Sequence, residues 1–190
     1  MKRSLGAIVL IAMLGIALPV KAQDDATKMG LYTGYDYIRF NVNSNVNGVL
    51  SSDTFNANGG GGQLEYDANS RLGIVGDLTA YAVTYSNGSL AAWVMPYLVG
   101  PRINLHRGRI TPFTQALFGG ILASNKINNL GSENNFAMSA GGGLDIRISR
   151  HFSIRPVQAE YFLTKIPNGL NNRQNNFRFS AGVIFRFGRA

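Results

Sequence analysis

The sequence has no cysteine and only two histidines. Without cysteine the chain can form no disulfide, and it carries no lipoprotein-type anchor near residue 22. His106 and His151 stand apart in the chain, without a neighbouring cluster of acids, so we expect no metal site. The glycine runs at residues 59–62 and 141–143 lack the Gly-Lys-Ser/Thr ending of a phosphate loop. The sequence therefore predicts no cofactor.

Long apolar runs are also missing, with one exception at the start of the chain. Residues 5–20 carry no charge and follow Lys2 and Arg3, and Val20-Lys21-Ala22 comes directly after them. A run of this length is short of the about 20 residues that a transmembrane helix needs. The pattern predicts a secretory signal peptide over residues 1–22 and a mature domain over residues 23–190. An uncleaved membrane anchor is the alternative.

Acidic residues are fewer than basic ones. The full chain has 18 Lys and Arg against 10 Asp and Glu, and removal of Lys2, Arg3 and Lys21 leaves 15 against 10. The basic residues are dispersed and form no run, so the charge does not indicate a nucleic-acid partner. Arginines inside a β-barrel, or bases at its rims against anionic lipid head groups, explain the excess better.

Alternating apolar and polar residues fill most of the mature region. Eight such segments are separated by clusters of Asn, Gly and Ser, which is typical of strands and turns. The predicted strands span residues 30–40, 60–68, 71–84, 89–105, 109–123, 135–148, 152–165 and 176–187.

The connections alternate in length. Short turns are expected at residues 67–71, 106–109 and 149–151, and longer Asn- and Gly-rich loops at 41–58, 124–134 and 166–175, with a shorter one at 85–88. Short periplasmic turns and long extracellular loops are the layout of an outer-membrane barrel. We therefore predict an all-β fold, an eight-stranded antiparallel up-and-down transmembrane β-barrel with both ends in the periplasm. Because the chain ends with the last strand, no peptidoglycan-binding domain is expected.

The final strand resembles the C-terminal sorting signal of outer-membrane barrels. Its polar residue, glycine and two aromatics are Ser180, Gly182, Phe185 and Phe187, and Gly188, Arg189 and Ala190 follow. The barrel-assembly machinery reads this signal by pairing with the strand edge. The resemblance implies that machinery as a partner during insertion.

Further stretches resemble the OmpA-like family of small outer-membrane barrels, in particular its short single-domain members. They read GYDYIRFN at residues 34–41, TPFTQALFGG at 111–120, GGGLDIRISRHFSIRPVQAEYFLT at 141–164 and NNFRFSAGVIFRFG at 175–188. The resemblance implies a location in the outer membrane of a Gram-negative-type bacterium, with outer-membrane lipid and lipopolysaccharide as partners. It does not imply one activity, because the family includes anchors, adhesins and small pores.

A soluble β-sandwich or lipocalin-like barrel would show the same alternation, with the apolar face turned inward. The signal peptide, the loop asymmetry and the last strand favour the membrane form. In that form the polar faces line the lumen, and the charged residues there are Asp77, Arg102, Asp145, Arg147, Glu160, Arg178 and Arg186.

The lumen of an eight-stranded barrel is just filled by side chains, and an unpaired buried charge costs several kcal/mol, so the lumen charges are expected to pair. A plug of ion pairs that braces the barrel is the first interpretation, and a conducting polar path is the second.

Enzymatic chemistry has one weak candidate, His151-Phe-Ser153 with Glu160. His151 falls in a predicted turn, and Glu160 is about 23 Å from Ser153 along an extended strand, too far for a triad. We therefore expect a structural or surface-interaction protein without enzymatic activity. A narrow pore for ions or small solutes is the alternative, and a lipid-modifying enzyme is the third hypothesis.

Overall fold

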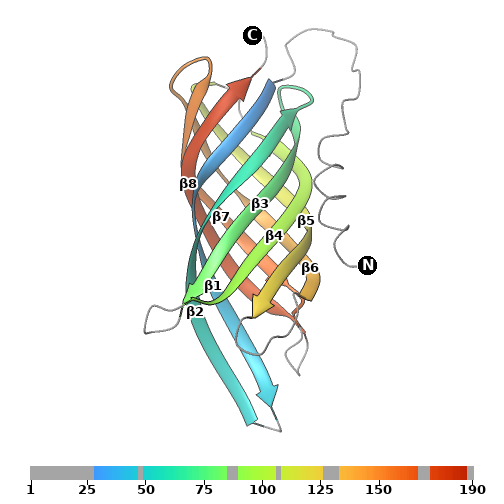
Figure 1. Cartoon of the computed structure of the whole chain (residues 1–190). Helices are drawn as coiled ribbons and strands as arrows, with labels where there is room; N and C mark the ends of the chain where they lie inside the picture. Colours follow the sequence, from blue (N-terminus) through green and yellow to red (C-terminus); the bar gives the residue numbers. More distant parts are fainter. Residues whose placement is uncertain are drawn as a thin grey trace, which may run out of the picture.

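A computed structural model describes residues 28–46, 49–84, 90–105, 108–125, 133–166 and 172–187. The predicted signal peptide, residues 1–22, lies outside these ranges. Within them the chain forms eight strands (Figure 1): β1 Lys28–Val46, β2 Val49–Asp67, β3 Leu72–Thr84, β4 Leu90–Asn104, β5 Ile110–Asn125, β6 Glu133–Arg147, β7 Phe152–Thr164 and β8 Gln174–Phe187. No helix in the described ranges is long and apolar enough to cross a membrane.

The strands form one closed barrel. Each strand pairs with the next in antiparallel fashion, and β8 returns to β1, where Met29 pairs with Phe187 and Arg39 with Phe177. The turns β2–β3, β4–β5 and β6–β7 lie at one end of the barrel, where β1 begins and β8 ends (Figure 1). We call this the short-turn end and the opposite one the long-loop end. The predicted eight-stranded up-and-down barrel is confirmed.

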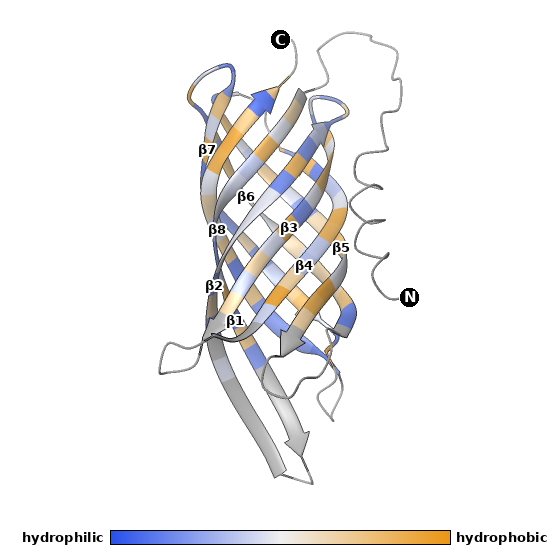
Figure 2. Ribbon diagram, viewed as in Figure 1, coloured by the Kyte–Doolittle hydropathy of each residue, from blue (hydrophilic) through white to orange (hydrophobic). Residues whose placement is uncertain are grey.

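The outer wall of the barrel is apolar. Large hydrophobic side chains alternate along the strands and leave 42 to 56% of their surface exposed, as at Phe185 and Phe187. Figure 2 shows hydrophobic residues alternating with hydrophilic ones along the visible strands. The intervening side chains point inward, and they include buried acids and arginines. This arrangement is that of a membrane barrel, because a soluble barrel would bury the aromatic face.

The first two strands are longer than the sequence predicts. Residues 41–58 were expected to be a loop, but β1 continues to Val46 and β2 begins at Val49. Because β1 pairs with β8 only as far as Arg39, the outer part is a two-stranded ribbon beyond the barrel wall (Figure 1). The segment is rich in Asn and Ser and lacks apolar alternation, because a ribbon above the membrane has no lipid-facing side.

The lumen has two kinds of filling. Arginines and acids occupy the part toward the short-turn end, and most of an apolar cluster lies toward the long-loop end, together with buried polar side chains such as Thr164 and Asn176. In β7, for instance, Glu160 is followed toward the long loops by Phe162, which is completely buried. The buried members of the apolar cluster are Ile38, Phe40, Ala57, Val75, Tyr81, Val94, Leu98, Leu117, Ile121, Ala137 and Phe162.

Candidate functional site

The polar lumen contains two linked clusters of ion pairs. The first joins two arginines and two acids from four different strands. Arg102 of β4 contacts Glu65 of β2 at 2.7 Å and Asp145 of β6 at 2.5 Å. Arg155 of β7 contacts the same two acids, Glu65 at 2.5 Å and Asp145 through Nε at 2.7 Å. Each buried charge therefore meets two charges of opposite sign, which offsets its desolvation cost.

One aromatic ring packs against both guanidinium groups of this cluster. The Phe113 ring centroid lies 3.7 Å from Cζ of Arg102 and 4.4 Å from Cζ of Arg155. Arg155 also lies over the Tyr32 ring, at 4.7 Å. Guanidinium planes stack well on aromatic faces, so both arginines are fixed in position as well as neutralised.

The second cluster is centred on Arg178 of β8. Its Nη1 and Nη2 donate to the two carboxylate oxygens of Asp77 in β3, at 3.2 and 3.0 Å. Its Nε donates to Glu160 of β7 at 2.6 Å. Gln115 and Ser139 also donate to Glu160, at 2.9 and 3.3 Å. This arginine thus ties three strands together. β7 and β8 are neighbours on one side of the barrel, and β3 lies across the lumen from them.

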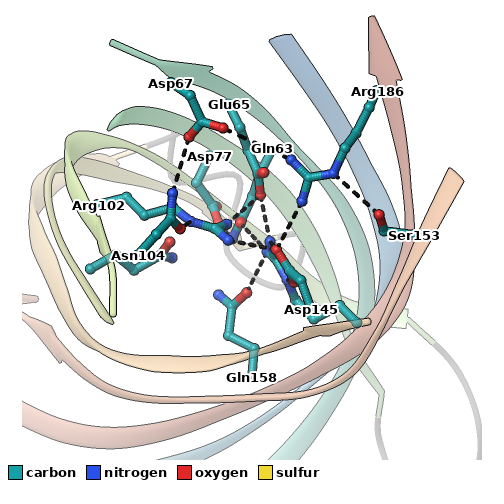
Figure 3. A network of polar contacts seen from close by, with 12 residues as sticks. Gln63, Glu65, Asp67, Asp77, Arg102, Asn104, Asp145, Ser153, Gln158 and Arg186 are labelled. Carbon is teal, nitrogen blue, oxygen red and sulfur yellow. Dashed lines mark hydrogen bonds and ion pairs between the residues drawn. The ribbon is translucent and has the colours of Figure 1, made fainter. Parts of the chain in front are cut away.

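One glutamine connects the two clusters. Gln63 of β2 donates through Nε2 to Asp77 at 2.7 Å, and its Oε1 accepts from Arg155 at 2.8 Å. The carbonyl and amide ends of this side chain thereby serve different clusters. The two clusters therefore form a single network (Figure 3).

Arg186 of β8 joins the network at the short-turn mouth. Its Nη2 lies 3.3 Å from Asp145 and its Nη1 4.0 Å from Asp67. Its Nε donates to Ser153 at 3.2 Å (Figure 3). With 13% of its side chain exposed, Arg186 is the least buried arginine of the ion pairs described in the structure.

Six of the seven charged residues that the sequence assigns to the lumen take part in these pairs: Asp77, Arg102, Asp145, Glu160, Arg178 and Arg186. Arg147 differs from the expectation, because it is half-exposed and enters no ion pair among the described residues. It is the last residue of β6, at the rim of the barrel.

Four further acids and bases of the lumen were not predicted: Asp36, Glu65, Asp67 and Arg155. Glu65 and Asp67 follow from the alternation in β2 that places Leu64 and Tyr66 outward, and Asp36 follows from the alternation in β1 that places Tyr35 outward. Arg155 does not follow from an alternation, because the β7–β8 register shifts between Arg155 and Gln158. Pro156 and Val157 both face outward there. As a result, odd-numbered residues face the lumen up to Arg155, whereas even-numbered residues face it from Gln158 to Glu160. Pro156 is the available signal, since proline within a strand marks a bulge or an edge.

The four residues of the expected sorting signal lie on opposite faces of β8. Phe185 and Phe187 face outward, and Ser180 faces the lumen, where it donates to Asp36 at 2.5 Å. Gly182 pairs with Gly34 of β1. A Cβ on Gly182 would lie 2.3 Å from the Thr33 carbonyl oxygen, so no side chain fits at this position.

No catalytic or metal-binding arrangement is found in the described residues. His151 is exposed in the β6–β7 turn, whereas Ser153 is buried and accepts a hydrogen bond from Arg186. No group of three or more His, Asp or Glu side chains is placed to hold a metal ion in these ranges. His106 lies outside them.

The profile of the outer membrane protein beta-barrel domain matches residues 8–185. The chain belongs to this family. It is therefore an outer-membrane β-barrel, as its resemblance to small barrels predicts, and the family indicates the outer membrane of a Gram-negative bacterium. A search of curated protein sequences gives no match.

Solved structures of other outer-membrane barrels share the fold at low sequence identity. Neisserial surface protein A has a TM-score of 0.60 and 16% identity, over 86% of this chain and 100% of the other. OprG from Pseudomonas aeruginosa has a TM-score of 0.56 and 10% identity, over 85% and 96%. Ail, the attachment invasion locus protein of Yersinia pestis, has a TM-score of 0.51 and 17% identity, over 85% and 99%.

Proposed function

We propose that the protein is a closed, non-conducting barrel, rigidified by its lumen network, that holds its long-loop end at the cell surface for interaction with the surroundings. The observation that carries this proposal is the filling of the lumen. Five acids pair with four arginines in one network, and an apolar cluster follows toward the long loops. A continuous path for ions would have to cross both.

The surface role is supported by the β1–β2 ribbon. It extends the barrel at the long-loop end (Figure 1). Enzymatic activity is not part of the proposal, because the lumen carries its polar groups in ion pairs rather than next to a reactive nucleophile.

A narrow pore is the second candidate, and one observation favours it. Tyr32 Oη and Asp36 Oδ2 are buried in the lumen without a hydrogen-bond partner among the described residues. Buried polar atoms of this kind are commonly satisfied by water. A line of water through the barrel would supply the path that the pore needs.

Planar-bilayer recording separates the two candidates. The closed barrel predicts no conductance steps from the purified protein. Replacing Leu117 and Phe162 by Ser, both fully buried in the apolar cluster, should then create them. Phe179→Ser, on the outer wall, is the matched control and should remain silent. Steps from the unmodified protein that Arg178→Gln alters would establish the pore instead.

A further inference from the structure

One acid of the lumen stands apart from the ion-pair network. Six acids are buried there, and the arginines of the network pair with five of them. The sixth is Asp36 of β1, which is 3% exposed and forms no ion pair among the described residues. Its Oδ1 accepts a hydrogen bond from Ser180 at 2.5 Å, and its Oδ2 has no hydrogen-bond partner in the same ranges. A carboxylate buried in this way needs a positive charge beside it.

The neighbouring arginine on the wall is already engaged. Arg178 lies two residues before Ser180 on β8, and Ser180 is the rung partner of Asp36. The Nε of Arg178 donates to Glu160, and its Nη1 and Nη2 donate to Asp77. All three nitrogens thus serve two other acids, so the charge that balances Asp36 comes from another source.

Two tyrosine hydroxyls adjoin the same part of the lumen. Tyr32 and Tyr81 are each 1% exposed, and neither Oη has a hydrogen-bond partner among the described residues. The Oη of Tyr32 lies over Gly34, since a Cβ there would be 2.4 Å away, and the next inward residue of β1 is Asp36, about 7 Å along the strand. The ring of Tyr81 lies over Gly59, the rung partner of Asp36 in β2. With no side chain at positions 34 and 59, both rings can lie against the wall next to the carboxylate.

These oxygens suit a cation with a single charge. A hard cation bonds oxygen at about 2.4 Å, so it holds two oxygens up to about 5 Å apart, farther than a direct hydrogen bond reaches. It therefore accounts for hydroxyls that lie beside a carboxylate without donating to it. Water would satisfy the hydroxyls but leave the charge of Asp36 unbalanced. A divalent ion favours several acids, and no group of three or more acids or histidines in the described ranges is placed to hold one.

We propose that Asp36, Tyr32 and Tyr81 bind one small monovalent cation, such as sodium, inside the lumen. The next inward residue of β1 is Ile38, a member of the apolar cluster, so the cation lies where the polar network meets that cluster. The barrel takes up this ion from solution as it folds, and its stability depends on the ion's concentration. The inference goes beyond the proposed function, which does not depend on how Asp36 is neutralised.

The test is urea unfolding of the protein in phosphatidylcholine vesicles at constant ionic strength, with sodium replaced stepwise by the bulky cation N-methylglucamine. Above the dissociation constant, each tenfold rise in sodium should raise the folding equilibrium constant about tenfold. Asp36→Asn keeps the shape of the side chain and should abolish this dependence. The matched control, Asp67→Asn, removes the same charge from an acid near Arg186 at the mouth and should keep the dependence in full.

The tyrosines give a second pair of variants that leave the carboxylate in place. Tyr32→Phe and Tyr81→Phe each remove one oxygen and should shift the sodium dependence to concentrations on the order of tenfold higher. These two variants decide the matter if Asp36→Asn does not fold, because an unchanged sodium dependence in both would remove the site.

Three other results would overturn the proposal. Equal stability of the unmodified protein in sodium and in N-methylglucamine would leave a proton or water at Asp36. A sodium dependence that persists in Asp36→Asn would assign the ion to another place. Loss of the dependence in Asp67→Asn as well would mean that the overall charge of the lumen attracts the ion. Each of these results leaves the closed lumen untouched, since conductance measures that separately.

Discussion

Arg155 of β7 reaches across the lumen to Glu65 of β2, and the two charged groups are 2.5 Å apart although 90 residues separate them in the sequence. Arg155 is completely buried, and Glu65 nearly so. The pair therefore connects opposite walls of the barrel by a contact that no strand pairing provides.

Replacing Arg155 by Gln should destabilise the barrel by about 3–5 kcal/mol, because Glu65 and Asp145 each lose one of their arginines while staying buried. Urea titration of the protein in lipid vesicles measures this loss. Arg109→Gln, an exposed base at the rim, should change the free energy of unfolding by less than about 0.5 kcal/mol. The double change Arg155→Gln/Glu65→Gln should recover part of the loss. Equal effects of Arg155→Gln and Arg109→Gln would contradict the bracing role.

The two terminal aromatics of β8 are expected to direct assembly. Phe185→Ala/Phe187→Ala removes two outward rings next to the β1–β8 closure, so less protein should reach the outer membrane and more should remain in the periplasm. Fractionation with immunoblotting measures the distribution. Phe177→Ala/Phe179→Ala removes two rings of equal size from the other half of β8, and this control variant should insert into the outer membrane better than Phe185→Ala/Phe187→Ala. Normal insertion of the first variant would show that the sorting signal lies elsewhere.

Tryptophan placed on either side of the wall should distinguish lipid from lumen. In a Trp93→Phe background, Phe179→Trp replaces a side chain that is 47% exposed on the outer wall, and Phe162→Trp one that is fully buried. Brominated lipids should quench the fluorescence of the first variant strongly and of the second weakly. The reverse order would mean that the faces are assigned wrongly.

The absence of cysteine allows a direct test of orientation. Ser52→Cys in the β1–β2 ribbon should react with a membrane-impermeant maleimide in intact cells. Ser149→Cys in the β6–β7 turn should react only after the outer membrane is opened. Labelling of the turn variant in intact cells would place the short-turn end outside.

Most of the barrel was predictable from the sequence, and the exceptions have physical causes. Where a strand separates lipid from lumen, alternation reveals both its bounds and its faces, as in β3 and β8. The ribbon was missed because it has no lipid side. Arg155 was missed because the Pro156 bulge reverses the alternation between it and Glu160. Which lumen arginine forms an ion pair with which acid could not be predicted at all, because contacts across the lumen depend on how far each long side chain reaches.

The closure of β1 against β8 has a consequence for the order of events in biogenesis. Met29 of β1 pairs with Phe187 of β8, so the strand pairing that closes the barrel joins the first described strand to the last. Such contacts between distant residues form slowly and late. The wall cannot shut before the final strand has been synthesised and exported, and until then one edge of the sheet stays open. The growing chain must therefore be protected from aggregation during its whole transit to the membrane.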